Sequence, residues 1–442
     1  METPICDFVQ AYADAEPLRL HVPGHKGTEY LGMERLDITE IDGADSLYEA
    51  SGIIARSEEN ASRLFDCPTF YSTEGSSHCI RAMLYLAGMG ARKEGRKPVI
   101  AAARNVHKSF LSAVALLDYD VVWLYPQESE SYLSCRVTAQ ALEDVLSKEP
   151  VTAVYVTSPD YLGCLADISS LAETAHRHGC LLLVDNAHGA YLRFLPELLH
   201  PMALGADLCC DSAHKTLPVL TGGAYLHTAK GSPLAAQAKN ALALFGSTSP
   251  SYLILQSLDM ANALLAGDYA RQIGVFSEKV AHLKDLLTTH GYRLYGDEPL
   301  KLTISTKSYG YTGKAFAQAL QENNVFCEFA DPDFTVMMLM PELGDRGLKR
   351  LEEILLSIPR KAGISEKPPV FRKAEKVMSV REAVLAPCEQ MLVGESTGRI
   401  LALASVGCPP AVPILVCGER IDENAISCFS YYGIETCAVV EE

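Results

Sequence analysis

Short apolar runs alternate with amphipathic stretches between about residues 66 and 265. Four of the runs have the length and apolar character of buried strands. They are PVIAAAR (98–104), DVVWLYP (120–126), VTAVYVTSP (151–159) and LLLVD (181–185). Helical patterns at 137–147 and 169–178 separate them. This alternation predicts a parallel sheet covered by helices, in the α/β class.

The pattern changes after residue 265. Helices are predicted at roughly 269–290, 313–323 and 344–357, with strands KLTIST (301–306), NNVFCEFA (323–330) and TVMMLMP (335–341) among them. ISEKPP (364–369) is typical of a linker. We therefore expect an N-terminal arm (1–65), a large domain (66–265), a small α+β domain (266–363) and a C-terminal domain (364–442).

Composition narrows the class of protein. The chain has 442 residues, of which 48% are apolar and 21% charged, as in ordinary globular proteins. Its formal charge of −17 argues against nucleic acid or an anionic membrane as a partner. The chain opens on no signal-peptide pattern, and no apolar run approaches the length of a membrane span. The 14 cysteines include no CxxC pair, which predicts reduced thiols in a cytoplasmic protein and no metal site.

The stretch DSAHKTLPVLTGGAYLH (211–227) holds Lys215 between two apolar segments. Ser212 and His214 precede the lysine, and a Gly-Gly turn follows it. An amine kept away from water can form a Schiff base with a carbonyl cofactor. The alternative is a lysine at a strand end whose head group reaches solvent.

An acid stands at the end of a second apolar run. LLLVDNAHGA places Asp185 after four apolar residues, with Ala187 and His188 close behind. Open α/β sheets bind ligands at the carboxyl ends of their strands. A carboxylate there can keep a pyridinium nitrogen protonated, which lets pyridoxal phosphate (PLP) act as an electron sink. Asp185 could also be an ordinary cap, but its pairing with Ser-Ala-His-Lys some thirty residues later favours a cofactor site.

Two hydroxyl-rich segments come before predicted helices. Gly75, Ser76 and Ser77 open the helix of STEGSSHCIRAML, where backbone N–H groups could cradle a phosphate. A plain serine N-cap is the alternative. Ser247 and Thr248, in GSTSPSY (246–252), precede a long helix and form a second candidate anion site.

Nine segments together resemble the Orn/Lys/Arg decarboxylase family of fold-type I PLP enzymes, in the short form without an N-terminal wing domain. They are HVPGHKG (21–27), 36–65, STEGSSHCIRAML (72–84), ARNVHKS (103–109), TSPDYLGCLADI (157–168), VDNAHGA (184–190), DSAHKTLP (211–218), FGSTSPSYLILQSLD (245–259) and PPAVPILVCGERI (409–421). The resemblance implies a three-layer α/β/α large domain with smaller α+β C-terminal domains. It also implies a PLP-dependent decarboxylase of arginine, lysine or ornithine that yields a polyamine precursor.

The resemblance assigns roles to individual residues. Lys215 would carry the cofactor, Asp185 would pair with its ring nitrogen, and His107 would stack on the ring, although His107 could equally be a polar residue at a helix start. Small Ala187 would let the ring lie flat, and the phosphate ligands would include Ser212 and His214. Ser247 and Thr248 would reach the phosphate of the other subunit, which implies a homodimer with composite active sites.

Two acids are candidates for the substrate. Asp160 follows the strand at 151–159 and would face the same cleft, and Glu419 could bind the distal cation of the substrate. The sequence departs from the family at Thr28, Ala411 and Cys417, which puts the substrate in doubt more than the cofactor.

Two other functions remain open at this stage. An aminotransferase or a Cβ lyase of the same fold would share Asp185 and Lys215, and could clamp a carboxylate with Arg372, Arg399 or Arg420. A non-catalytic PLP-binding paralogue would be expected to have lost Lys215 first.

Overall fold

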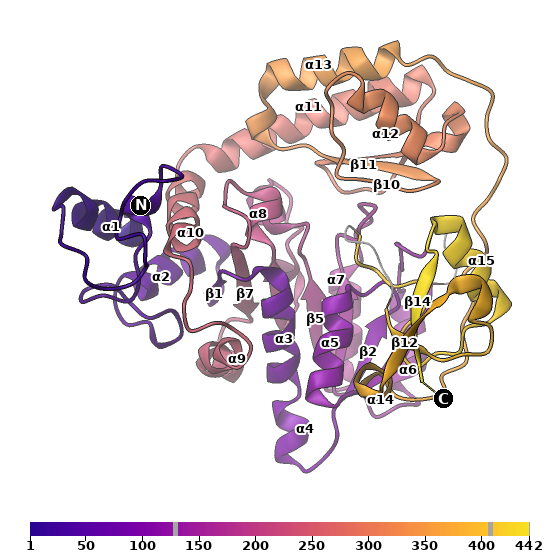
Figure 1. Cartoon of the computed structure of the whole chain (residues 1–442), viewed down its shortest axis with the longest axis horizontal. Coiled ribbons are helices and arrows are strands. Elements are labelled where there is room, and N and C mark those ends of the chain that lie inside the picture. Colours follow the sequence, from indigo (N-terminus) through magenta and orange to yellow (C-terminus); the bar gives the residue numbers. More distant parts are fainter. Residues whose placement is uncertain (127–130, 405–409, 442) are drawn as a thin grey trace. The chain divides into compact units, whose positions relative to one another are not determined.

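The computed structural model describes residues 1–126, 131–404 and 410–441 (Figure 1). Their contacts divide the chain into two compact units, 1–90 with 181–274 and 91–180 with 275–442. Each unit combines segments that lie far apart in the sequence. Pro409, the first residue of the PPAVPILVCGERI segment, lies outside the described residues.

The first unit contributes four strands in the order β1-β7-β6-β5. They are β1 (Thr69–Ser72), β7 (Ala224–Thr228), β6 (Leu208–Asp211) and β5 (Leu181–Asp185). Strands β5 and β6 are parallel, with Asp185 opposite Cys210, and β7 is antiparallel to both β6 and β1. Asp185 and Asp211 therefore end neighbouring parallel strands at the same edge of the sheet.

Helices enclose these strands. Helix α3 (Gly75–Ala87) packs on β6 and β7, and α9 (Ala238–Ala243) packs on α3. The arm forms α1 (Pro4–Asp14) and α2 (Ile53–Phe65), which pack against each other and against α10 (Tyr252–Ala266). The buried carboxylate of Asp259 accepts backbone N–H groups from Ile5 and Cys6 at 2.9 and 3.0 Å. It thereby binds the start of the arm to α10.

The second unit contributes three parallel strands in the order β4-β2-β3. They are β4 (Ala153–Thr157), β2 (Val99–Ala103) and β3 (Asp120–Leu124), and all three lie within the predicted runs. The connecting helices are α5 (Lys108–Leu117), α6 (Ala139–Leu146) and α7 (Ile168–Arg177). The α/β architecture read from the sequence is confirmed.

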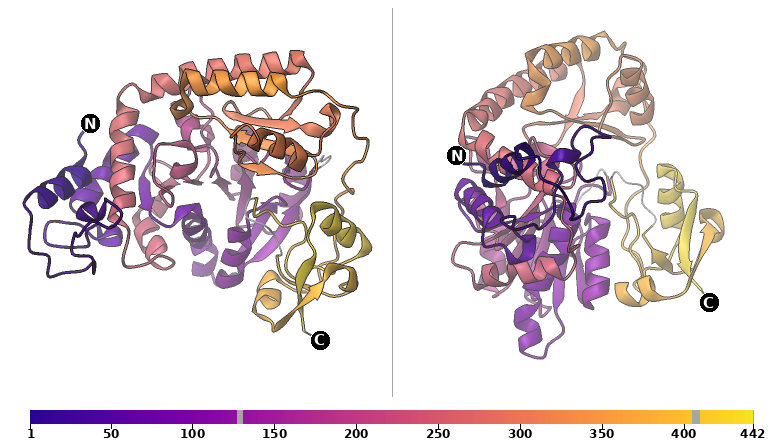
Figure 2. Two further views of the ribbon diagram at one scale, coloured as in Figure 1. Left: turned by 45° about the horizontal axis from the view of Figure 1, so that its top comes forward. Right: turned by 60° about the vertical axis from the view of Figure 1, so that its left-hand side comes forward.

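A four-stranded antiparallel sheet follows, in the order β10-β11-β9-β8. Its strands are β8 (Arg293–Tyr295), β9 (Lys301–Ser305), β10 (Phe329–Ala330) and β11 (Phe334–Met338). Helices α11 (Tyr269–His290), α12 (Gly313–Gln321) and α13 (Gly344–Ser357) lie over one face of it (Figures 1 and 2). The strand expected over 323–330 is wrong for most of its length, because residues 322–325 end α12, with Asn324 in the left-handed region at φ 54°.

The tail forms a three-stranded sheet in the order β12-β14-β13. Its elements are α14 (Val380–Leu385), β12 (Cys388–Leu392), β13 (Leu401–Leu403), α15 (Glu423–Tyr432) and β14 (Thr436–Val440). The segment expected to be a linker, 364–369, carries no helix or strand. Among the described residues, no helix is both long and apolar enough to cross a membrane.

Candidate active site

Lys215 lies in a four-residue helix, α8 (Ala213–Thr216). Helix α8 begins directly after Ser212, which follows the last residue of β6. The side chain of Lys215 is half-buried, and its Nζ lies 3.0 Å from Nε2 of His188. The amine is therefore held beside an imidazole within the first unit.

Asp185 is almost fully buried at the carboxyl end of β5. Its Oδ1 accepts the backbone N–H of Ala187 at 3.2 Å and contacts Sγ of Cys210 at 3.7 Å. The turn Asn186-Ala187-His188 thus folds around the carboxylate and brings His188 to Lys215. The three residues that follow Asp185 therefore place His188 in contact with Lys215, and so link the acid to the lysine.

The start of α3 meets the residue before α8. The Ser212 hydroxyl donates to the Ser76 hydroxyl at 2.7 Å, and the backbone N–H of Gly75 donates to the Gly222 carbonyl at 2.7 Å. A Cβ atom on Gly75 would have no atom within 4 Å, so open space borders this helix start. An unobstructed helix N-terminus lined by hydroxyls fits a phosphate group. Ser77, the third predicted member, occupies the same first turn of α3.

His214 points toward the Gly-Gly turn. Its Nδ1 lies 3.0 Å from the Gly223 carbonyl. Burial lowers the pKa of His214, and the nearby charge of Lys215 lowers it further, so the ring stays neutral near pH 7. A neutral ring whose Nδ1–H donates to this carbonyl leaves Nε2 available as an acceptor.

His107 belongs to the second unit and is the N-cap of α5. Its Nδ1 accepts the backbone N–H of Ser109 at 3.1 Å and lies 2.8 Å from the Ser109 hydroxyl. The ring orientation is fixed by these contacts. The polar helix-start role is therefore observed, and a stacking role remains a prediction.

Ser247 and Thr248 are exposed. The backbone N–H of Ser247 donates to Oε1 of Glu74, the N-cap residue of α3, at 2.6 Å. This contact brings the exposed segment close to the open space at Gly75. Sequence reasoning missed Glu74, although it directly precedes the glycine of the predicted cradle.

Asp160, a predicted substrate ligand, is 3% exposed in the second unit. Its Oδ1 accepts the backbone N–H groups of Leu162 and Cys164 at 3.0 and 2.9 Å, and burial raises the pKa of this carboxyl. The carboxylate is thus engaged in shaping its own turn. A substrate contact by Asp160 stays a prediction.

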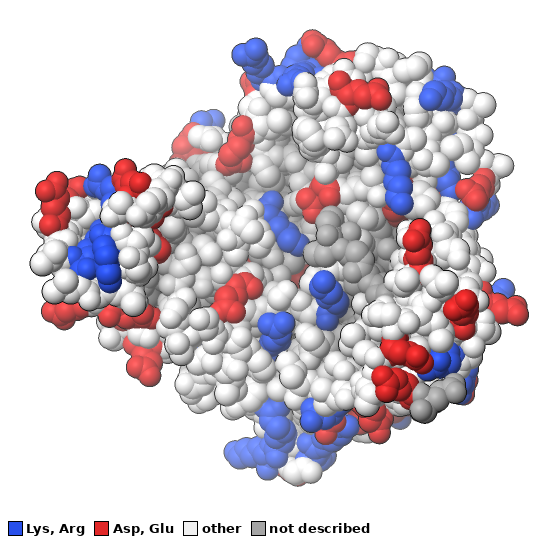
Figure 3. All heavy atoms as spheres, in the orientation of Figure 1, with Lys and Arg blue, Asp and Glu red and all other residues white. Residues whose placement is uncertain are grey.

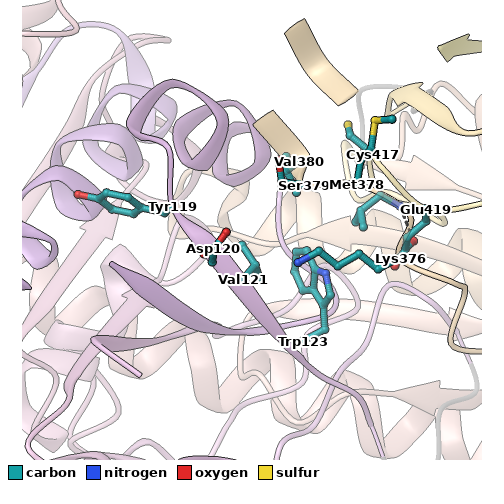
Figure 4. Close-up of a pocket in the computed structure, with 11 residues that line it drawn as sticks. Tyr119, Asp120, Val121, Trp123, Lys376, Met378, Ser379, Val380, Cys417 and Glu419 are labelled. Carbon is teal, nitrogen blue, oxygen red and sulfur yellow. Dashed lines mark hydrogen bonds between the residues drawn. The ribbon is translucent and has the colours of Figure 1, made fainter. Parts of the chain in front are cut away.

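Glu419 lies in the interior of the second unit, at 3% exposure. Its Oε2 is 3.0 Å from Nη2 of Arg104, which is equally buried, and accepts the backbone N–H of Val416 at 2.8 Å. Figure 4 shows Glu419 beside Lys376, with Trp123 near the lysine stem. The pocket drawn there has a volume of about 10 Å³, room for one water molecule at most. The role of Glu419 toward a substrate stays a prediction.

Asp211 is a buried group that the sequence analysis passed over. It ends β6 as Asp185 ends β5, so the same pattern of an acid after an apolar run could have identified it. Asn186 Nδ2 donates to its Oδ1 at 2.7 Å, and Nε2 atoms of His200 and His227 lie 3.0 and 3.1 Å from its Oδ2. A charged network thus lies directly behind the candidate site.

His200, Cys209 and Asp211 form a buried group with the chemistry of metal ligands. However, Nδ1 of His200 accepts the backbone N–H of Met202 at 3.4 Å. The proton of a neutral ring is then on Nε2, which donates to Asp211 and has no lone pair for a metal. Burial raises the pKa of the Cys209 thiol well above its usual range. The group is therefore a hydrogen-bonded cluster, and the described cysteines are free thiols.

Comparison with known proteins finds related sequences that extend over most of the chain. The sequence model described as "Orn/Lys/Arg decarboxylase, major domain" matches residues 3–291. The chain is 31% identical to the arginine decarboxylase of Bacillus subtilis over 462 residues, which cover 96% of this chain and 92% of the relative.

Solved structures agree on the fold. Lysine decarboxylase A from Pseudomonas aeruginosa matches with a TM-score of 0.82 at 17% identity, over 99% of this chain and 80% of that chain. A Sphingomonas wittichii serine palmitoyltransferase matches with a TM-score of 0.56 at 14% identity, over 79% of this chain and 82% of that chain. The fold-type I architecture expected from the sequence is confirmed.

Proposed function

The chain belongs to the Orn/Lys/Arg decarboxylase family and is a PLP-dependent amino-acid decarboxylase; from this premise we propose that it decarboxylates arginine, lysine or ornithine to a polyamine precursor. The observation that carries the proposal is the Lys215 amine, 3.0 Å from His188 on the turn that begins at Asp185. An aminotransferase or a Cβ lyase is not favoured. Arg399 and Arg420, two of the arginines considered as carboxylate clamps, pair with Glu389 and Glu375.

The residues present fit PLP. The opening at Gly75, bordered by Ser76 and Ser212, would take the phosphate, and the buried Asp185 would hold a proton on the ring nitrogen. When bound, the cofactor supplies an electron sink for the pair of electrons that the departing carboxylate leaves behind. Lys215 would hold the cofactor covalently through Nζ.

The chain's own groups would guide substrate and protons. Lys215 Nζ or a nearby imidazole would deliver the proton that replaces the departed carboxylate, and His188 holds the amine in place through their 3.0 Å contact. His107 would stack on the ring and orient the substrate carboxylate for its departure. The small side chain of Ala187 would leave room for the ring.

We further propose a cytoplasmic homodimer with composite sites. Ser247 and Thr248 are exposed, as a segment that reaches a partner's phosphate site must be. The cationic substrate also suits the formal charge of −17. The absence of a CxxC pair and the free thiols of the described residues fit a reducing compartment.

A substrate panel tests the proposal. Released CO2 and amine are measured with arginine, lysine and ornithine, alongside the visible absorbance of bound cofactor, for the wild type and Lys215→Ala. Lys230→Ala is the matched control, because Lys230 lies in the same unit in an exposed pair with Asp66. We expect one amino acid to be decarboxylated, and Lys215→Ala to lose the visible band and at least about 10³-fold in kcat.

Each other outcome has a definite meaning. A visible band without CO2 from any of the three amino acids would remove the decarboxylase proposal and leave the cofactor. An unchanged band in Lys215→Ala would remove the assignment of Lys215.

A further inference from the structure

One buried carboxylate links the end of β5, where Asp185 lies, to the end of β6, which leads into the Lys215 helix. Asp211 is fully buried, and its Oδ1 accepts a hydrogen bond from Asn186 Nδ2 at 2.7 Å. Asn186 directly follows Asp185, and Asp211 directly precedes Ser212 of the Lys215 segment. The Asn186 backbone N–H also donates to the Cys210 carbonyl at 3.0 Å. The turn after β5 is thus fastened to the end of β6 by side chain and backbone together.

Two histidines fix the orientation of this carboxylate. His200 and His227 reach Oδ2 from the segment before β6 and from β7, so Oδ1 is left facing Asn186. Burial acts to raise the pKa of Asp211, but the two histidines outweigh it and hold the pKa well below its usual range. This shift favours the charged carboxylate, which is the stronger acceptor for the hydrogen bonds from Asn186 and the two histidines.

We propose that Asp211 and Asn186 are positioning residues, which together hold the Asp185 carboxylate and the Lys215 amine at the spacing that the cofactor requires. The inference rests on the proposed function, because it assigns these residues to the PLP site. Asp211 acts through Asn186 and touches no reacting atom. Reactions that depend on such spacing lose about 10²-fold in rate when a group moves by 1 Å.

A matched carboxylate lies at the opposite end of the same two strands. Asp207 precedes β6, and its Oδ2 accepts the backbone N–H of Leu182 at the start of β5, at 2.8 Å. Asp207→Asn weakens a β5–β6 contact away from the strand ends that carry Asp185 and Lys215. Asn186→Ala removes the side-chain part of the proposed tether and keeps the backbone hydrogen bond to the Cys210 carbonyl. It also leaves the contacts between Asp211 and the histidines in place. Asp211→Asn keeps the shape of the side chain and removes its charge.

The experiment combines a readout on the protein alone with cofactor binding and turnover. Hydrogen–deuterium exchange is measured on peptides covering 185–190 and 211–217, the PLP dissociation constant on stripped protein, and kcat and KM on the reloaded enzyme. For Asn186→Ala and Asp211→Asn we expect about tenfold faster exchange in both peptides and about 10- to 100-fold weaker PLP binding. We also expect kcat to fall further than KM changes, and the double variant to be no worse than the more severe single variant. Asp207→Asn should leave all these quantities near wild type.

The outcomes distinguish a failure of the positioning role from a failure of the proposed decarboxylase function. Wild-type PLP affinity and exchange in Asn186→Ala, or equal losses in Asp207→Asn, would overturn the positioning role. If Asp211→Asn fails to fold, Asn186→Ala decides alone. If the wild type binds no PLP, the proposed function fails and the assignment to a PLP site fails with it, whereas unchanged exchange in the variants would show that the tether itself is wrong.

Discussion

Removing one member of a buried ion pair leaves the other charge without a partner in the protein interior. Arg104 and Glu419 are each 3% exposed, and the Arg104 guanidinium also lies 5.3 Å from the ring of Trp123. Glu419→Gln should lower the free energy of unfolding by about 3 to 5 kcal/mol, because the arginine keeps its charge at any accessible pH. Chemical denaturation of purified enzyme measures the change.

An exposed pair in the same unit is the control. Arg420 Nε lies 2.7 Å from Glu375, and both side chains are more than one-third exposed. Glu375→Gln should cost at most about 1 kcal/mol. A Glu419→Gln enzyme that keeps wild-type stability and shows only a raised KM would contradict the structural role and support Glu419 as the ligand of the substrate cation.

The turn between β10 and β11 carries a carboxyl group that makes stability depend on pH. Burial raises the pKa of Asp331 to about 6, and the backbone N–H groups of Phe334 and Asp333 only partly oppose it. Between the unfolded pKa near 4 and the folded pKa near 6, the folded state binds the extra proton. Stability should therefore rise as the pH falls from 6 to 4, by up to about 3 kcal/mol from this group. The free energy of unfolding is measured by denaturation at several pH values for the wild type and Asp331→Asn. Its rise between pH 6 and 4 from this group should be present in the wild type and absent from the variant.

Elements were predictable from sequence where periodicity alone decides the structure. The parallel strands and α13 lie where the apolar runs placed them, because buried strands and amphipathic helices leave a strong pattern. The segment 323–330 failed because its residues also serve to end α12, which a strand pattern does not reveal. The expected domain boundaries stay a prediction.

The candidate site was predictable only in part. Lys215 and Asp185 follow apolar strands, so their positions could be inferred from the chain. The contacts Lys215–His188, Asp211–Asn186 and Arg104–Glu419 join residues 25 to 315 positions apart. Such pairings depend on strand order and side-chain direction, which one sequence does not specify.

The surface of the whole molecule carries mixed charges, and its arm also exposes large apolar side chains. Acidic and basic side chains are interspersed on the face shown in Figure 3. Large apolar side chains are exposed in the arm, where Leu18, Leu20, Tyr30 and Leu31 are each at least 78% exposed. Exposed apolar side chains of this size favour burial against another chain. If the proposed dimer buries these side chains, Leu20→Glu combined with Leu31→Glu should shift the protein toward monomer in sedimentation equilibrium. A dimer that persists in this variant would place the interface elsewhere.

Composite sites can be tested by mixing two inactive proteins. Lys215→Ala lacks the proposed cofactor lysine, and Ser247→Ala with Thr248→Ala lacks the segment proposed to serve the partner. After subunit exchange, a mixed dimer with composite sites has one site in which every group is intact, because Lys215 comes from one chain and Ser247 from the other. Half of the dimers are mixed and each has one good site of two, so roughly a quarter of wild-type activity should return. If each site is built from a single chain, every site stays defective and mixing restores nothing beyond the average of the two parents.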